Sequence, residues 1–156
     1  MTVAPFPASV AFPENAERRA AITRDIQAAT GLDEAVLERL VRAFYARARQ
    51  DEVIGHLFDD VADWEQHIAR IAAFWSSVGL LTGRYHGQPL AVHLPLGLEP
   101  QHFSRWLTLF EATLNEVCTP EAAAYLTEKA RRIARSLELG IAVHKGVLPS
   151  SPSSER

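Results

Sequence analysis

Hydrophobic residues recur along most of this chain at the three- and four-residue spacing of amphipathic helices. The clearest pattern spans about residues 63–81, where one helix face would carry Trp64, His67, Ile68, Ile71, Phe74, Trp75 and Val78. The same spacing predicts helices over about residues 14–29, 33–48, 100–117 and 120–141. No segment alternates convincingly at the two-residue period of a strand, so we predict an all-α fold.

Residues 82–100 interrupt this helical periodicity. They contain three glycines and three prolines, which predicts a loop. His93 lies between Pro89 and Pro95, and these prolines leave room for little more than one helical turn. We therefore expect His93 on a short helical tether within the loop. A second short segment, over residues 53–58, joins two of the predicted helices.

The composition is typical of a single water-soluble domain. Of the 156 residues, 47% are hydrophobic and 22% are charged. The 16 basic residues are interleaved with 19 acidic ones, so no basic surface for nucleic acid is predicted. The uncharged run over residues 71–83 is too short to cross a bilayer, and the N-terminus lacks the basic start of a signal peptide. We expect a cytoplasmic protein that binds neither nucleic acid nor a membrane.

Two histidines lie in contrasting settings. His67 is on the apolar face of the helix predicted over residues 63–81, whereas His93 is on the tether, with aromatic residues before and after it. Two imidazoles placed in this way suit a flat, apolar cofactor with a metal at its centre, so the pattern favours haem. Each histidine alone has a simpler interpretation, His67 as a hydrogen-bonded core residue and His93 as an exposed loop residue.

The single cysteine, Cys118, limits how such a cofactor would be held. One cysteine cannot form an internal disulfide, and the chain lacks the Cys-x-x-Cys-His sequence that attaches haem covalently. The expected cofactor is therefore haem b, bound without a covalent link. A reducing compartment is the usual setting of such a chain, which agrees with a cytoplasmic location.

The order of these residues resembles a known family, the truncated haemoglobins, and within it the third group. The resemblance covers about residues 35–141 and is most specific over residues 64–75, 85–90 and 106–110, with His93 just after the second stretch. It implies a truncated globin fold, in which a two-on-two helical sandwich surrounds haem.

The resemblance also divides the chain into three parts. Residues 32–146 would form the truncated globin domain. Residues 1–31 would be an N-terminal extension with one extra helix, either a cap on the domain or part of a subunit contact. Residues 147–156 are rich in serine and proline and would be a disordered tail. The oligomeric state is left open.

The resemblance further implies roles for side chains around haem. His93 matches the proximal histidine that binds the iron, and Tyr45, His67 and Trp106 match distal residues that face the ligand on the iron. His67 is also a candidate for a second iron ligand. The other residues expected to contact haem are Phe44, Phe58, Arg70, Ile71, Phe74, Tyr85, Leu90, Phe103, Phe110 and Ile133. Without haem, the aromatic residues would be ordinary core and Arg70 a solvated surface residue.

The distal donors suggest what the protein does with O₂ and other diatomic ligands. Hydrogen bonds to charged groups contribute roughly 1.5–3 kcal/mol each, and about 1.4 kcal/mol changes an affinity tenfold. Slow O₂ release favours redox chemistry with nitric oxide, peroxide or nitrite over storage, with electrons from an unidentified donor. The enzyme would then be of the nitric oxide dioxygenase or peroxidase type. The alternatives are a haem-based ligand sensor without turnover and a helical interaction domain without a cofactor.

Overall fold

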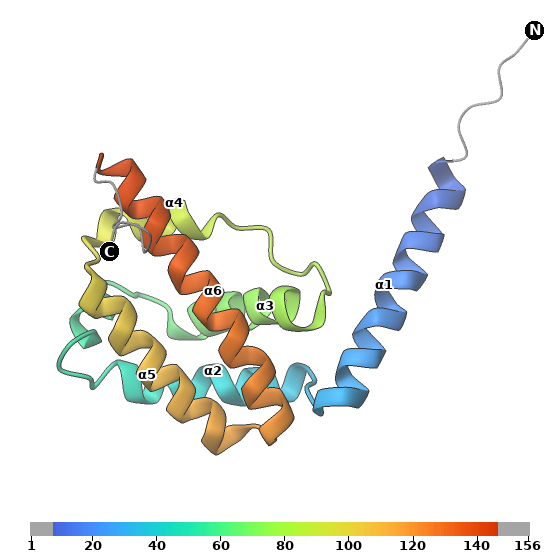
Figure 1. Ribbon diagram of the computed structural model, residues 1–156, viewed down its shortest axis with the longest axis horizontal. Coiled ribbons are helices and arrows are strands. Elements are labelled where there is room, and N and C mark those ends of the chain that lie inside the picture. Colours follow the sequence, from blue (N-terminus) through green and yellow to red (C-terminus); the bar gives the residue numbers. More distant parts are fainter. Residues whose placement is uncertain (1–7, 147–156) are drawn as a thin grey trace, which may run out of the picture.

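Helices account for all the regular structure of residues 8–146, the part of the chain that the computed structural model describes (Figure 1). In chain order they are α1 (Ala8–Thr30), α2 (Glu34–Ala48), the 3₁₀-helix η1 (Gly55–Phe58), α3 (Trp64–Leu80), α4 (Pro89–His93), the 3₁₀-helix η2 (Leu94–Leu96), α5 (Pro100–Val117) and α6 (Pro120–His144). No strand occurs in this part of the chain, which confirms the predicted all-α fold. None of these helices is both long enough and apolar enough to cross a membrane.

Side chains just before three of the helices fix where the helices begin. Asp33, Asp63 and Thr119 each accept a hydrogen bond from the amide three residues further on, at 2.8, 3.1 and 3.1 Å. Such N-cap bonds satisfy amides that have no partner within the first helical turn. The starts predicted for α2, α3 and α6 therefore agree with the structure.

The four long helices after α1 form two packed pairs. In Figure 1, α2 and α3 run antiparallel behind the antiparallel pair of α5 and α6. The most extensive contacts join α5 to α6, α2 to α5 and α2 to α3, while the short α4 rests on α6. This arrangement is the predicted two-on-two sandwich.

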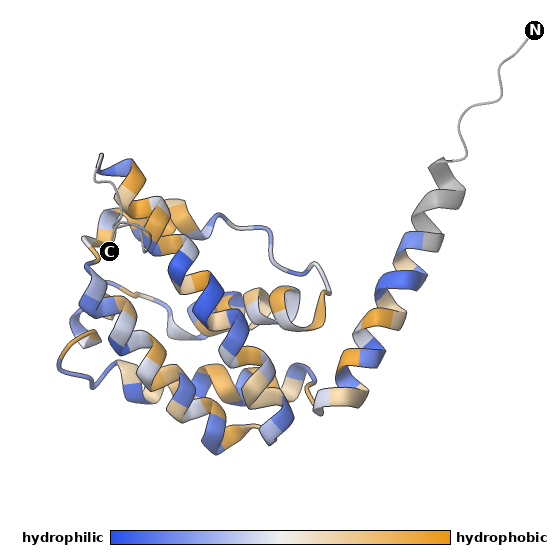
Figure 2. Ribbon diagram, in the orientation of Figure 1, coloured by the Kyte–Doolittle hydropathy of each residue, from blue (hydrophilic) through white to orange (hydrophobic). Residues whose placement is uncertain are grey.

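The hydrophobic faces of these helices meet between the two pairs. Figure 2 shows hydrophobic and hydrophilic residues alternating along each long ribbon, as amphipathic helices require. The most deeply buried large side chains are Leu37, Leu40 and Val41 of α2, Leu80 of α3, Phe110 and Leu114 of α5, and Leu126 of α6. Burying one such side chain contributes about 1.5–3 kcal/mol, so this core holds the helices rigidly relative to one another.

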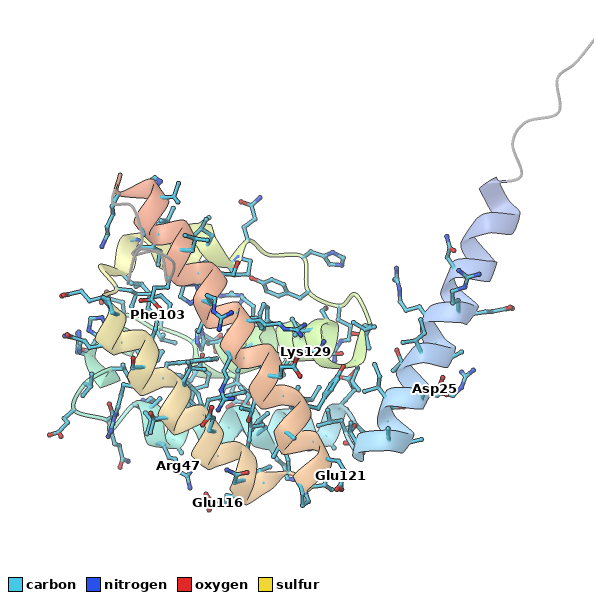
Figure 3. The ribbon with its side chains drawn as sticks, viewed as in Figure 1. Asp25, Arg47, Phe103, Glu116, Glu121 and Lys129 are labelled. Atoms are coloured by element: carbon cyan, nitrogen blue, oxygen red, sulfur yellow. The ribbon has the colours of Figure 1, made fainter. Side chains whose placement is uncertain are left out.

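Two polar links join α5 to α2 and to the segment that follows α2. Arg47 of α2 pairs with Glu116 of α5, and both are labelled at the lower edge of Figure 3. Asp51, whose side chain is 4% exposed, accepts a hydrogen bond from Arg105 of α5 at 2.8 Å and two more from the amides of residues 53 and 54. Arg105 holds the pKa of Asp51 below its ordinary value. The second link thus fastens the start of the η1 segment to α5.

The N-terminal helix lies to one side of the sandwich. It begins at Ala8, six residues before the predicted start at residue 14. The helix contacts α3 and α6, and its N-terminal part points away from the other helices (Figure 1). The tail predicted over residues 147–156 lies outside the described residues.

Candidate functional site

A large cavity is lined by α3, by α4 and η2, and by the first half of α5, with contributions from α2, the η1 segment and α6. The predicted site residues that line it are Tyr45, Phe58, His67, Arg70, Ile71, Phe74, Tyr85, His93, Phe103, Trp106 and Ile133. Both histidines of interest therefore face one space, although they come from different elements. Apart from the polar tips of a few side chains, the wall is hydrocarbon.

Three residues predicted to contact a cofactor do not line this cavity. Phe44 and Phe110 lie behind its wall, where they border a second, small cavity of about 20 Å³, and Phe110 stacks on Trp106 with ring centroids 5.0 Å apart. Leu90 lies against Gly140 of α6, where an added Cβ would stand 3.0 Å from the Leu90 side chain. On a single helical turn Pro89 and His93 share a face, and Leu90 is on the next face.

Other residues line the cavity that the sequence did not single out. They are Ile54, Leu57, Trp75, Pro89, Val92, Leu96, Leu98, His102, Ala134 and Leu137. Leu137 was within reach of prediction, because it lies one helical turn after Ile133 on the same face of α6. No pattern in the sequence marks His102, whose Nδ1 accepts a hydrogen bond from the Glu99 amide at the start of α5.

The Tyr45 hydroxyl and Nε2 of His67 are 3.1 Å apart on the cavity wall. Burial raises the pKa of Tyr45, so the phenol keeps its proton at any physiological pH. Burial, and secondly the positive charge of Arg70, lower the pKa of His67, so its imidazole is neutral near pH 7. The wall therefore carries a phenol and a neutral imidazole joined by one hydrogen bond.

Aromatic rings hold Tyr45 in this position. The rings of Phe58, Trp64 and His67 meet that of Tyr45 edge to face, with centroids 5.3, 5.4 and 5.0 Å away. Arg49 lies over Trp64, 4.1 Å from the ring centroid. Such edge-to-face pairs favour one orientation of the rings, so the hydroxyl is fixed in direction.

The His93 imidazole is prepared to act as a metal ligand. Its Nδ1 is 2.5 Å from the carbonyl oxygen of Pro89, one turn earlier. A carbonyl only accepts hydrogen bonds, so Nδ1 carries a proton, and in the neutral ring the lone pair is on Nε2. A hydrogen bond from the other ring nitrogen is the usual support of a metal-bound histidine.

The donor set fits a cofactor that brings most of its own metal ligands. Among residues 15–146, whose side chains the structure describes, no group of three or more His, Cys, Asp and Glu side chains could hold a bare metal ion. The cavity instead offers His93, His67 and apolar walls, and Arg70 adds an exposed cation for an acidic group. These features suit the iron, the macrocycle and the carboxylates of haem.

Comparisons with known proteins agree with this chemistry. The family model of the bacterial-like globins matches residues 26–138. The Group 3 truncated hemoglobin ctb of Campylobacter jejuni is 36% identical over 104 residues, in an alignment that covers 63% of this chain and 82% of that protein. The crystal structure of group III truncated hemoglobin from Campylobacter jejuni is 34% identical, with a TM-score of 0.64 over 69% of this chain and 89% of that one. The family match leaves out most of α1.

Proposed function

The chain belongs to the bacterial-like globins and to the group III truncated haemoglobins, and on this premise we propose that it holds haem b for redox chemistry on a diatomic ligand. Proteins of this family bind haem, and through it diatomic ligands. Bound haem supplies an iron centre that takes such ligands and changes oxidation state. The residues that we assign to the site, and the choice of redox chemistry over sensing, are our proposal.

We propose that His93 would bind the haem iron. Its hydrogen bond to Pro89 leaves Nε2 free and fixes the plane of the ring, which supports this assignment. The apolar residues Phe58, Phe74 and Ile133 would contact the macrocycle, and Arg70 would pair with a carboxylate. Residues 32–146 would carry all of these groups, with residues 1–31 as an extension of the globin domain.

Three side chains would act on the ligand from the distal side. Tyr45, His67 and Trp106 line the cavity, and each carries an O–H or N–H group. The phenol remains protonated and His67 remains neutral, so a hydrogen bond from Nε2 of His67 to the phenol oxygen leaves the Tyr45 proton for a ligand that gains negative charge. Their mutual hydrogen bond is the observation that carries the proposal, because it fixes the Tyr45 hydroxyl at one point of the wall and lets His67 strengthen it as a donor.

Such donors slow the release of a charged ligand. Each hydrogen bond to a charged group contributes roughly 1.5–3 kcal/mol, which is about tenfold or more in dissociation rate. A carrier needs rapid release, whereas a reaction on the ligand benefits from a long residence time. We therefore propose either the oxidation of nitric oxide with O₂ as the oxidant, or the reduction of peroxide or nitrite. An unidentified donor would supply the electrons that each cycle requires.

The test is turnover by the haem-loaded protein with a chemical reductant, and with O₂ present when nitric oxide is the substrate. The protein should consume nitric oxide, peroxide or nitrite over many cycles, and Tyr45→Phe should lower the rate at least tenfold for one of them. Tyr125→Phe is the matched control, because that hydroxyl donates to the Gly79 carbonyl at 2.8 Å and Tyr125 does not line the cavity. If the protein binds ligands tightly but turns over none of the three substrates, the redox proposal is overturned in favour of sensing.

A further inference from the structure

The N-terminal helix makes its contacts at one place in the fold. Most of α1 precedes residue 26, where the family match begins, and its N-terminal part points away from the sandwich (Figure 1). Its C-terminal part reaches the end of α3 and the first residues after it, through Thr23 and Arg19. These residues lead into the segment that ends at His93.

The chain leaves α3 through a strained turn. Leu81 follows the last residue of α3 and has φ 59° and ψ 35°, in the left-handed region. It is the only residue other than glycine with a positive φ among residues 8–146 for which the backbone is described. A leucine in this conformation persists only where its surroundings hold it there.

Contacts from α1 hold this turn on one side. The Thr23 hydroxyl donates to the carbonyl of Leu80 at 2.5 Å, one residue before the strained position. The guanidinium of Arg19 lies over Gly83, 3.2 Å from where a Cβ would stand. Residues on both sides of Leu81 are therefore in contact with α1.

Glu34, the first residue of α2, holds the same segment on the other side. Its carboxylate accepts hydrogen bonds from the hydroxyl of Ser76 at 2.8 Å and from the guanidinium of Arg84 at 2.5 Å. The buried Ser76 hydroxyl also lies 2.6 Å from the hydroxyl of Thr82. Residues 82–84 thus run between fixed groups of α1 and α2.

The path of this segment decides where the next residues reach the cavity. The Tyr85 amide donates to the hydroxyl of Ser77 at 2.7 Å, and its ring meets Phe74 edge to face at 5.2 Å. A Cβ on Gly87 would stand 2.2 Å from the Tyr85 hydroxyl, so this ring lies directly on the Gly87 backbone. Helix α4 and His93 follow within six residues of Gly87.

We propose that Thr23 and Arg19 are positioning residues, which hold the Leu81 turn and thereby set the position of Tyr85 and His93 at the cavity. The part that concerns iron rests on the proposed role of His93. The extra helix α1 would therefore act as a brace, which holds residues 82–93 in place, rather than as a separate module. It acts through the Leu80 carbonyl and through Gly83, neither of which lines the cavity.

Hydrogen exchange of residues 82–93 in the full-length protein tests the brace without relying on haem. Thr23→Val removes the donor at nearly constant shape and should speed exchange in this segment roughly fivefold, as expected for one lost hydrogen bond. Thr23→Ser should restore the slow rate. Arg19→Ala should act like Thr23→Val, whereas Arg18→Ala, at an exposed position of the same helix, should change nothing.

A double variant separates a brace from general loss of stability. Glycine adopts the left-handed conformation freely, so in a Leu81→Gly background the turn no longer needs α1 to hold it. In this background Thr23→Val should change the exchange rate by less than about twofold. In the protein that keeps Leu81, Thr23→Val should have its full effect. The proposal would be overturned if Thr23→Val had an equal effect on exchange in both backgrounds, or if it had no effect in the protein that keeps Leu81.

The haem-loaded protein gives a second readout. In the ferrous form, the iron–histidine stretching band should shift or broaden in Thr23→Val and Arg19→Ala, and should stay as in wild type in Arg18→Ala. An unchanged band together with faster exchange would overturn the part that concerns His93. If another residue binds the iron, His93→Gly would keep the band, while the exchange results would still decide whether the brace exists.

Discussion

The Tyr45 hydroxyl of α2 lies 3.1 Å from Nε2 of His67 on α3. If Nε2 carries its proton, His67 donates to the phenol oxygen and leaves the phenol proton free for a ligand in the cavity. A donor that is itself a hydrogen-bond acceptor is polarised and becomes a stronger donor. The two residues therefore act as one unit, and the effects of replacing them should not add.

Tyr45→Phe removes the phenol hydroxyl and keeps nearly all the apolar volume. We expect O₂ to dissociate about tenfold faster or more, because one hydrogen bond to a charged ligand is lost. Stopped-flow displacement of O₂ by carbon monoxide measures this rate. The control Tyr125→Phe, at a residue that does not line the cavity, should release O₂ at the wild-type rate.

Trp106→Phe tests the third donor in the same way. Its indole N–H is lost while an aromatic ring remains beside Phe110, and O₂ release should again quicken about tenfold. Combined with Tyr45→Phe, the effect should be smaller than the product of the single effects if the donors share one network. If O₂ dissociates from both single variants at the wild-type rate, Tyr45 and Trp106 serve only to pack the core.

His67 is expected to gate the cavity rather than to bind the iron permanently. Tyr45 and Trp106 already place bulky groups at the same wall, which favours an open or water-bound iron. Ferric spectra at neutral pH should therefore be high-spin in the wild type and in His67→Leu, with faster ligand entry in the variant. A low-spin wild-type spectrum that becomes high-spin in His67→Leu would establish His67 as a ligand instead.

The lowered pKa of His67 also predicts how stability depends on pH. The unfolded chain takes up the His67 proton near pH 6.5, and the folded chain takes it up only at lower pH. The contribution of neutral His67 to stability is thus complete above about pH 6.5, is lost as pH falls from there through the folded pKa, and then levels off.

Denaturant unfolding of the wild type and His67→Leu at several pH values measures this dependence. The wild type should lose stability relative to the variant on going from pH 7 to pH 5. A difference between them that is constant over this range would contradict the direction of the pKa shift.

Asp51→Ala should destabilise the protein by about 2–3 kcal/mol, because it leaves two backbone amides and Arg105 without their acceptor. Denaturant unfolding measures the change, and Glu52→Ala, at the exposed neighbouring position, is the control. The pKa of Asp51 is lowered, so its contribution is present at neutral pH and is lost as pH falls below the ordinary Asp value, near 4. Equal stability of both variants at pH 7 would contradict the role given to Asp51.

Local spacing predicted the helices, and the resemblance to a known family predicted about half of the residues that line the cavity. An apolar residue every three or four positions defines one face of a helix, and the N-cap residues Asp33 and Thr119 mark where helices begin. His67, Ile71 and Phe74 share such a face on α3, so they reach the cavity together. The tether of His93 followed from its two flanking prolines.

Other features depend on contacts between distant segments, which spacing does not reveal. Leu90 turns to Gly140 of α6 because the single turn of α4 has only one face toward the cavity. Phe44 lies behind the wall because α5 places Trp106 in front of it. The left-handed conformation of Leu81 was equally hidden, since the residue that usually signals it is glycine.

The haem spectrum of His93→Gly tests the central claim most directly. The full-length wild type, reconstituted with haem, should show an intense Soret band and retain haem through gel filtration. His93→Gly should retain little haem, and added imidazole should restore binding by taking the place of the missing side chain. If His93→Gly keeps an unchanged Soret band without imidazole, His93 is not the iron ligand and the proposed site is wrong.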